Sequence, residues 1–396
     1  MTTHSRLARV LALGLTAFLF ACSDANQPKS GAAPAPAPVS ATLTAAGFAG
    51  DVMRVHYIDM DQGNATLVEF KCAAILIDAG GEKESPPKLI KYLDDFFAKR
   101  PDLNRTLAAI YITHTHIDHN VSLDDVVKRY TVHNYIHTGV YDGHSGSGPA
   151  NWMRNHANDN GRKIAQRAVD WEEIAKSPNR PGVSDDVIDP VKCAGSDPRI
   201  RVVHGQRDKK PADWTNDDFR DANNGSLVIR IDYGKSSFLF LGDIETPAID
   251  MMVDFYGSTK TLEADVFLAS HHGSANGTTS SLMKAMAPQI GVISMGRADG
   301  RDGFTAWQHG HPRKVAVDLM VAGIKRSRSP PKTVRVAVGQ REFVPMTISK
   351  ALYATGWDGT VIVTADRNGK IEVGNDNGPI AAIERPAAEQ VSLLRK

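Results

Sequence analysis

The chain has 396 residues, which is enough for one large domain or two ordinary ones. Its hydrophobic fraction of 42% and charged fraction of 23% are those of a soluble globular protein. The formal net charge of +1 excludes a chain-wide attraction to polyanions, so any role with nucleic acid must rest on local features.

The first 22 residues predict a targeting segment. A basic start precedes an apolar run, Val10 to Phe20, which is too short to span a membrane comfortably. The run ends in L-F-A-C, which resembles a bacterial lipobox, and Cys22 would then carry acyl chains that anchor the protein to a membrane. The alternative is an ordinary signal peptide that is cut nearby. Either way we expect export to the cell envelope, and with the lipobox we expect a periplasmic or outer-surface lipoprotein.

A tether is predicted next. Residues 23–50 are rich in Ala, Pro, Ser and Thr, which is typical of a disordered linker. Export would place the two remaining cysteines, Cys72 and Cys193, in an oxidising compartment, where they either pair or stay as thiols. Both outcomes stay open, because the sequence does not show whether the two residues are close.

Short strands and one helix are predicted ahead of the first polar cluster. Apolar residues predict strands at 52–58, 67–70 and 74–77, and a helix follows at 86–99. Glycines mark tight turns after the first and third strands, in D-M-D-Q-G-N-A and in I-D-A-G-G.

The densest cluster of potential metal ligands is the segment T-H-T-H-I-D-H-N at 113–120. An apolar run with strand character precedes it and helical spacing follows it, so the cluster lies in a loop at the carboxyl end of a strand, where open α/β sheets place their active sites. In an extended turn His114 and His116 can hold one cation, while Asp118 and His119 diverge towards a second. Imidazole and carboxylate without cysteine suit Zn, Fe or Mn. The alternative is a solvated, histidine-rich loop.

The spacing H-x-H-x-D-H resembles the signature of the metallo-β-lactamase fold superfamily. That resemblance implies an α/β protein with a four-layer αβ/βα sandwich and metal-dependent hydrolysis. The two glycine turns are similar to the opening of the metallo-hydrolase domain of competence DNA-uptake channel proteins (ComEC type), with Asn64 in place of that family's Asp. At a strand end, Asp78 is expected to brace the metal loop without binding metal itself.

The middle of the chain is less regular. A predicted strand ends at His137, which is either a substrate contact or a plain surface histidine. Residues from about 141 to 198 are poorly patterned, apart from a helix predicted over 158–176, and they are longer than the family's usual connection, so we predict an insertion. The strand at 200–203 ends in His204. Many metallo-β-lactamase relatives have a histidine near here that completes the first metal site, whereas the competence-type relatives generally lack one.

Two later segments resemble the competence-type family most closely. Residues 223–245 match its pattern of Asn-Asn, Ser-Leu-Val, a hairpin and a strand that ends in Gly-Asp. That family uses this aspartate, Asp243 here, to bridge two metals; an ordinary helix N-cap is the alternative. Residues 263–270 lead into H-H-G-S, the most specific of these features. One of His271 and His272 is expected to bind the second metal and the other to face the substrate, and strand register decides which.

The last part of the domain is predicted as strands at 290–295, 333–338 and 360–364, with a helix at 313–322. His311 lies in a Gly-His-Pro that the family shares, which makes it a candidate phosphate contact. The predicted organisation is a signal peptide at 1–22, a linker at 23–50, a hydrolase domain at 51–374 and a loose C-terminal tail at 375–396.

The resemblance implies a reaction centre of two divalent cations, zinc with manganese or iron as alternatives, bridged by Asp243. Metal binding lowers the pKa of water and so supplies hydroxide for attack on phosphorus. The expected catalytic residues are Asp118, Asp243 and His311, and the expected substrate contacts are His137, Asn224 and Arg297. The expected metal ligands are His114, His116, Asp118, His119, His204, Asp243 and one of His271 and His272.

The function predicted first is a phosphodiesterase or nuclease that acts on nucleic acid or on a phosphate ester of the envelope. The alternatives are a β-lactamase or lactonase, and a non-catalytic binding lipoprotein. No feature of the sequence points to a protein partner. Basic residues after H-H-G-S form a candidate rim for a polynucleotide, or are scattered solvated charges: Arg297, Arg301, Arg313, Lys314, Lys325, Arg326 and Arg328.

Overall fold

Two β-sheets organise the protein in the computed structural model, which describes residues 51–257, 259–301, 305–376 and 378–384. The predicted signal peptide and linker, and most of the predicted tail, lie outside these residues. In spatial order, the strands of the larger sheet are β13 (Glu342–Lys350), β12 (Ser327–Gly339), β17 (Gly378–Glu384), β16 (Ile371–Asn375), β15 (Val361–Asp366), β1 (Val52–Tyr57), β2 (Thr66–Glu69), β3 (Ala74–Ile77), β4 (Thr106–Tyr111), β5 (Thr131–His137) and β6 (Ala165–Ala168).

The smaller sheet has six strands in the order β14 (Leu352–Ala354), β11 (Ile290–Ile293), β10 (Val266–Leu268), β9 (Ser236–Phe240), β8 (Val228–Tyr233) and β7 (Arg199–His204). The helices are α1 (Pro86–Lys99), α2 (Ile117–Asn120), α3 (Leu123–Arg129), α4 (Ser147–His156), α5 (Trp171–Lys176), α6 (Asn216–Arg220), α7 (Thr246–Tyr256), α8 (Ser280–Met286), α9 (Ala306–His309), α10 (Lys314–Gly323) and α11 (Thr355–Asp358).

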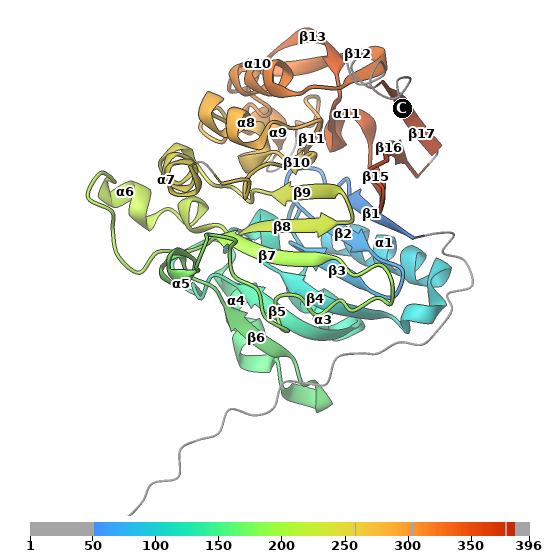
Figure 1. Ribbon diagram of the computed structural model, residues 1–396, viewed down its shortest axis with the longest axis vertical. Coiled ribbons are helices and arrows are strands. Elements are labelled where there is room, and N and C mark those ends of the chain that lie inside the picture. Colours follow the sequence, from blue (N-terminus) through green and yellow to red (C-terminus); the bar gives the residue numbers. More distant parts are fainter. Residues whose placement is uncertain (1–50, 258, 302–304, 377, 385–396) are drawn as a thin grey trace, which may run out of the picture. The chain divides into compact units, whose positions relative to one another are not determined.

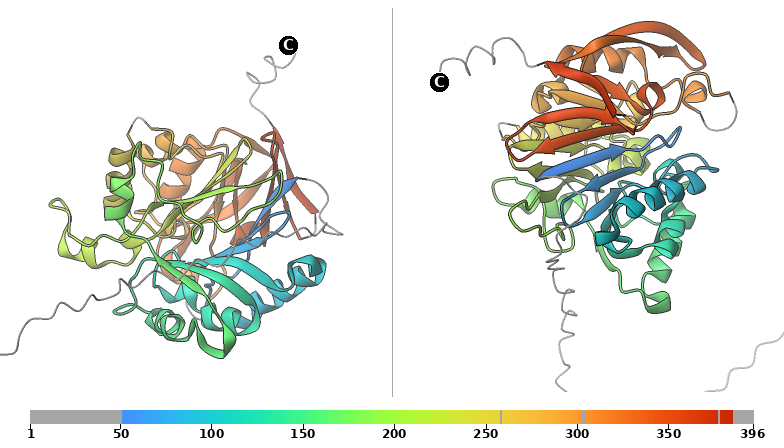
Figure 2. Two further views of the ribbon diagram at one scale, coloured as in Figure 1. Left: turned by 60° about the horizontal axis from the view of Figure 1, so that its bottom comes forward. Right: turned by 90° about the vertical axis from the view of Figure 1, so that its right-hand side faces the viewer.

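The two sheets pack face to face, with helices outside each of them. Alternate residues of a strand point to opposite faces. In β1, Val55 and Tyr57 belong to the core between the sheets, where the Tyr57 ring lies 6.3 Å from that of Phe240 in β9. In β3, Leu76 points the other way, into a second core with Leu93 of α1. Figure 2 shows helices of the first half of the chain, in cyan and teal, on one side. Helices α7, α8 and α10 pack on the outer face of the smaller sheet, so the predicted four-layer αβ/βα sandwich is confirmed.

Local sequence explains the best-predicted elements. Helix α1 spans Pro86–Lys99, as expected, with Pro in its first turn, where no backbone N–H donor is lost. Its buried residues Leu89, Leu93 and Phe96 recur at helical spacing and face the larger sheet. None of the described helices combines the length and the apolar run that crossing a bilayer requires.

Parallel strands bring the polar loops to one edge. Strands β3, β4 and β5 are parallel to each other, and so are β9, β10 and β11. The loops that follow β4, β9 and β10 carry the metal-loop histidines, Asp243 and H-H-G-S respectively. Because the carboxyl ends of parallel strands meet at a common edge, residues far apart in the sequence converge there.

Three predictions about this domain are corrected or completed. The predicted insertion at about 141–198 contains α4, β6 and α5. The helix predicted over 158–176 is confirmed only at its end, in α5, because residues 165–168 are an edge strand paired with β5. The predicted tail begins with a strand, because β17 pairs with β16 and β12 (Figure 1). The open question of the cysteines is answered by a Cys72–Cys193 disulfide, which ties the insertion to the turn after β2.

Candidate metal centre

Four buried side chains from both sheets converge at this common edge. Asp118 and His119 lie on α2 after β4, Asp243 follows β9, and His272 follows β10. One potential ligand atom from each lies within 4.8 Å of all the others. Two imidazoles and two carboxylates are a donor set that suits Zn, Fe or Mn.

Asp243 is the central member of this group. Its Oδ1 lies 3.2 Å from Nε2 of His119, and its Oδ2 lies 3.4 Å from Nε2 of His272. Nε2 of His272 also lies 3.3 Å from Oδ2 of Asp118. Each oxygen of Asp243 therefore faces an imidazole nitrogen of this group.

The hydrogen bonds of the imidazoles show that the group fits a cation. Nδ1 of His119 lies 2.7 Å from Oδ2 of Asp78, and Nδ1 of His272 lies 2.7 Å from the carbonyl oxygen of Ser294. Both partners only accept, so each Nδ1 carries a proton and each neutral ring keeps its lone pair on Nε2. These two Nε2 atoms lie 3.3 Å apart, beside two carboxylates. Only a positive charge between them makes that arrangement favourable, and a metal ion supplies it.

The pKa values of His272 and Asp243 also favour a cation site. Burial lowers the pKa of His272, but the carboxylates of Asp243 and Asp118 outweigh burial and raise that pKa to about 10. Burial raises the pKa of Asp243, yet His119 and His272 hold it well below its usual range. Without metal the histidines would therefore hold protons, so metal binding must release them and will weaken at low pH.

The first two histidines of the motif adjoin this group. Nε2 of His114 lies 3.2 Å from Nδ1 of His116, and the ring centroids of His114 and His119 are 4.2 Å apart. His204, at the end of β7, is fully buried and places Nδ1 2.8 Å from the carbonyl oxygen of Ser226. Its Nε2 has no hydrogen-bond partner among the described residues. The Ser226 hydroxyl accepts from the N–H of Asp243 at 3.1 Å, so one serine positions both side chains.

Asp78 braces the metal loop, as predicted. Its carboxylate accepts hydrogen bonds from the backbone N–H of Thr113 at 2.7 Å, the Thr113 hydroxyl at 2.9 Å and the Asn64 amide at 2.9 Å, besides contacting His119. Asn64 thus donates where an aspartate, in its charged form, would repel Asp78. Gly80 permits the close approach of this strand end, since a Cβ there would lie 1.7 Å from the carbonyl oxygen of Asp118.

The choice between the two histidines of H-H-G-S is now made. His272 belongs to the ligand group, whereas Nδ1 of His271 lies 3.3 Å from Oε1 of Glu245. Both residues have positive φ, 49° and 52°, which turns the two side chains in different directions. The ring of His311 lies 5.6 Å from His271 and 6.2 Å from His272, so His311 is beside the ligand group as expected.

Three predicted substrate contacts have partners elsewhere. His137 uses both ring nitrogens within its own loop, with the N–H of Gly139 at 2.9 Å and the Tyr141 hydroxyl at 3.2 Å. Asn224 donates to the carbonyl oxygen of Asp218 and accepts from the N–H of Glu245. Arg297 is exposed and forms an ion pair of 2.8 Å with Asp299. Their contact with substrate stays a prediction.

The predicted basic rim is wrong in part. Arg326 and Arg328 are buried in and beside β12, and Arg328 donates to Asp358 at 3.1 Å and to the carbonyl oxygen of Leu352. Alternate residues of this strand face inward, so Arg328 is held inside the fold. Arg326 lines a hollow near the start of β11 and not a rim around the metal centre.

Sequence reasoning missed several residues that build the site. Ser226 and Ser294 hold His204 and His272 through their backbone carbonyls, which leave no side-chain signature. His144 places its ring 5.7 Å from that of His116, and its loop is docked on the metal loop by bonds from the N–H of Gly146 to Thr115 and from the Asn120 amide to Gly146. A histidine in a glycine-rich insertion gave no signal of this position.

A mixed four-layer sandwich with a buried His/Asp group at the common edge of its sheets defines a metal-binding α/β domain. The chain belongs to the metallo-beta-lactamase superfamily, whose family model matches residues 58–297. Members of this superfamily are generally metal-dependent hydrolases, which accords with this donor set.

The curated relatives that the chain resembles are longer proteins. It is 22% identical to the uncharacterized protein YcaI of Escherichia coli over 65% of this chain and 26% of that protein. It is 32% identical to competence protein ComA of Neisseria gonorrhoeae over 28% of this chain and 14% of that protein. The chain thus spans about a quarter or less of the length of these relatives.

Two solved structures that the chain resembles have low sequence identity to it. The metallo-beta-lactamase fold protein YhfI of Bacillus subtilis matches 82% of this chain and all of its own, with 12% identity and a TM-score of 0.40. The short form of human tRNase Z matches 60% of this chain and 91% of its own, with 12% identity and a TM-score of 0.34.

Proposed function

We propose that this protein is a metal-dependent phosphodiesterase, with nucleic acid as its foremost substrate. The observation that carries the proposal is the buried group in which Asp243 faces both His119 and His272, with His114 and His116 directly beside it. Similarity to a competence protein favours a phosphodiester over a lactam as substrate.

The residues divide into two sets of ligands around Asp243. Asp118, His119 and His272 would hold one ion, and His114, His116 and His204 would hold the other. When bound, such ions activate water at neutral pH and neutralise charge on a phosphoryl oxygen.

His311 is set up to donate a hydrogen bond to the substrate. The N–H of Gly296 donates to Oε1 of Gln62, which turns the Gln62 amide nitrogen towards Nδ1 of His311 at 3.4 Å. Nδ1 must then accept, so the proton of the neutral ring lies on Nε2. Burial, with the neighbouring histidines, holds the pKa of His311 well below its ordinary value, so the ring is neutral at pH 7. Nε2–H is then available to a phosphoryl oxygen.

A different basic surface replaces part of the predicted rim. The guanidinium carbons of Arg301 and Arg341 lie 4.2 Å and 5.2 Å from the ring centroid of Trp307. Trp307 lies on α9, two residues before His309. The β12–β13 hairpin brings Arg341 there, because its tip is bonded to this segment through the N–H of Arg341 and the carbonyl oxygen of Trp307 at 3.0 Å. We propose this surface, Arg301, Trp307 and Arg341, as the part that holds a nucleic-acid strand by charge and stacking.

Metal analysis combined with two chromogenic substrates tests the function. Purified protein should carry about two transition-metal ions per chain and hydrolyse bis-p-nitrophenyl phosphate but not nitrocefin. Asp243→Ala should lose most of both metals and at least about a hundredfold in rate, while Asp318→Ala on the exposed face of α10 should lose neither. Turnover of nitrocefin alone would favour the β-lactamase alternative, and metal without turnover of either substrate would favour a binding protein.

We also propose export and lipidation at Cys22. Support comes from the disulfide between Cys72 and Cys193, since such bonds persist in oxidising compartments. Cys22→Ser should move the protein from the membrane to the soluble fraction, and unchanged fractionation would contradict the anchor.

A further inference from the structure

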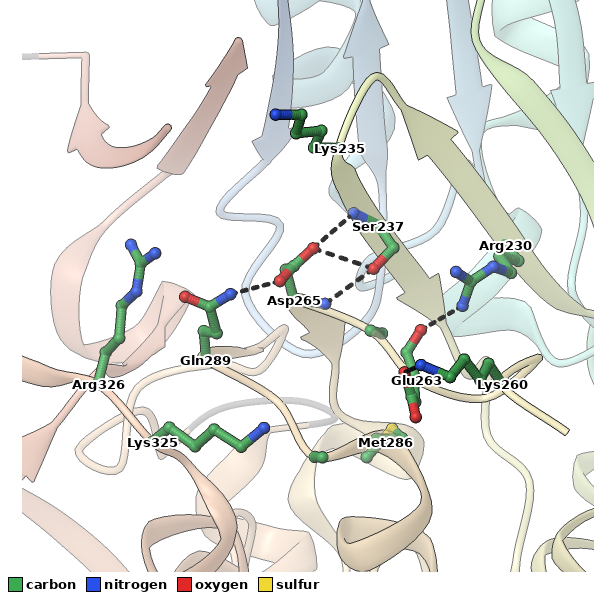
Figure 3. A pocket seen from close by; sticks show the side chains of 12 residues that line it. Arg230, Lys235, Ser237, Lys260, Glu263, Asp265, Met286, Gln289, Lys325 and Arg326 are labelled. Carbon is green, nitrogen blue, oxygen red and sulfur yellow. Dashed lines mark hydrogen bonds and ion pairs between the residues drawn. The ribbon is translucent and has the colours of Figure 1, made fainter. Parts of the chain in front are cut away.

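A basic hollow of about 520 Å³ lies at the opposite end of the smaller sheet from the metal centre (Figure 3). It is built where β9, β10 and β11 begin, around Ser237, Asp265 and Gln289. The metal ligands Asp243 and His272 follow the other ends of β9 and β10. Ser237 and Asp243 are six residues apart along the chain, so the backbone between them spans at most about 20 Å.

Positive charge exceeds negative charge in this hollow. Its lining has two carboxylates, Glu263 and Asp265, against five cationic side chains: Arg230, Lys235, Lys260, Lys325 and Arg326. Figure 3 shows Lys325 and Arg326 on one side, Arg230 and Lys260 on the other, and Asp265 between them. In a chain with a net charge of only +1, this is a local concentration of positive charge.

The central carboxylate is already satisfied by neutral donors. Asp265 accepts from the N–H of Ser237 at 2.9 Å, from the Ser237 hydroxyl at 3.0 Å and from the Gln289 amide. Glu263 is half exposed and its nearest cation, Lys260, is 3.8 Å away. In the part of the chain that the structure describes, no carboxylate oxygen lies within 4.0 Å of the amino groups of Lys235 and Lys325. These two lysines therefore remain available to an anion.

A buried arginine gives the hollow a rigid wall. Arg230 is 8% exposed and is fixed by the carbonyl oxygen of Thr261 at 3.0 Å and by Asp232 at 2.6 Å. Arg201 shares that same carboxylate, and Arg199 lies 3.9 Å from it. Three guanidinium groups thus surround one aspartate. A second hollow of about 720 Å³ contains all four and also touches Lys260, so the basic surface continues from one hollow into the next.

The lining also defines the class of ligand. No aromatic side chain lines the first hollow, so it lacks the stacking surface that base recognition uses. Fixed guanidinium groups and flexible ammonium groups recognise phosphate. We propose that this hollow binds a compact anion carrying two or more phosphoryl groups, at a site separate from the metal centre. This site does not depend on the proposed reaction.

Calorimetric titration of the metal-loaded protein with inorganic tripolyphosphate tests the site. Lys235→Gln combined with Lys325→Gln should weaken binding at least about tenfold, because two charge-assisted contacts are lost. Lys284→Gln, on the exposed face of the adjacent α8, should leave binding unchanged. All three proteins should keep the same metal content and the same rate with bis-p-nitrophenyl phosphate, which separates this site from the metal centre. Equal affinity in the double variant and the unchanged protein, or no binding at all, would overturn the proposal.

A second pair of measurements distinguishes the sources of the phosphate. Vesicles of phosphatidylcholine with cardiolipin present the same chemistry as a lipid headgroup, and vesicles of phosphatidylcholine alone are the control. Cardiolipin-dependent binding that the double variant loses would identify a headgroup as the ligand. Binding of tripolyphosphate without binding of cardiolipin vesicles would identify a soluble phosphate compound.

Discussion

Asp78 shows how a residue that touches no substrate can control a metal site. It is fully buried, and its two oxygens meet the metal loop at Thr113 and His119. The contact with His119 fixes which ring nitrogen carries the proton and therefore which one faces the ligand group. Partners of this kind also raise the basicity of the ligand they hold.

Asp78→Asn should therefore weaken metal binding without unfolding the protein. The amide is the same size and still accepts from Thr113, but its charge is gone and His119 loses its anionic partner. We expect metal affinity to fall about 10- to 100-fold, measured by competition with a chromogenic chelator. Asp318→Asn, on the exposed face of α10, is the control. Unchanged affinity in Asp78→Asn would contradict this role.

His137 is the residue for which a pH effect is clearest. Burial lowers the pKa of His137 to about 4. The unfolded chain, with an ordinary pKa near 6.5, binds the proton first as pH falls. The contribution of neutral His137 to the free energy of unfolding is therefore fully present above pH 6.5. It falls by about 3 kcal/mol as the pH drops from there to about 4. His137→Asn keeps an acceptor for Gly139, and its unfolding free energy should fall less steeply over this range. An equal slope in both proteins, measured by denaturant titration, would contradict the assignment.

Among the helices and strands, the well-predicted elements are those whose sequence pattern lies within one segment. Helix α1 was predicted with its observed ends, because its apolar spacing and starting prolines lie within one segment. The candidate metal loop could be predicted because four potential ligands lie within six residues of each other. Asp243 and the pair His271 and His272 could also be placed, since each follows a buried strand, but the choice of His272 came from the structure.

The missed elements depend on distant partners. Strand β6 is half polar and exists only because β5 pairs with it. Strand β17 joins β12 and β16 in a segment that reads as a tail. Strand β12 contains S-R-S-P-P-K, in which two prolines and four polar side chains conceal the strand. No local pattern shows that Arg328 in this strand is buried, because its partner Asp358 is supplied by α11.

Arg328 therefore belongs to stability rather than to binding. Arg328→Ala should lower the unfolding free energy by about 3 kcal/mol, because it leaves Asp358 buried with Lys332 as its remaining cation. Arg335→Ala, exposed on the same strand, should change it by less than about 0.5 kcal/mol. Urea unfolding of the three proteins measures both effects. If Arg328→Ala kept its stability but bound nucleic acid more weakly, the result would contradict this role and support the predicted basic rim.

For the whole molecule, the near-neutral net charge gives no long-range attraction for nucleic acid. The proposed nucleic-acid surface must therefore bind through local contacts with the phosphates. Cleavage of a single-stranded DNA should therefore fall steeply with salt, while hydrolysis of bis-p-nitrophenyl phosphate should change little. Replacing both Arg301 and Arg341 by Gln should reduce the logarithmic salt slope by about one to two units. Arg335→Gln on the same hairpin should leave it unchanged. Equal salt dependence for both substrates would point to a small envelope phosphodiester.

The position of β1 also sets the order of events while the chain is being made. This strand lies inside the larger sheet, paired with β2 on one side and with β15 on the other, where Val52 faces Asp366 (Figure 1). As the ribosome releases the chain from its amino end, β1 gains its first neighbour almost at once. Its second edge stays open until more than three hundred further residues have emerged. Exposed strand edges pair readily with other chains, so the nascent protein has a long interval in which it depends on being kept apart from its own copies.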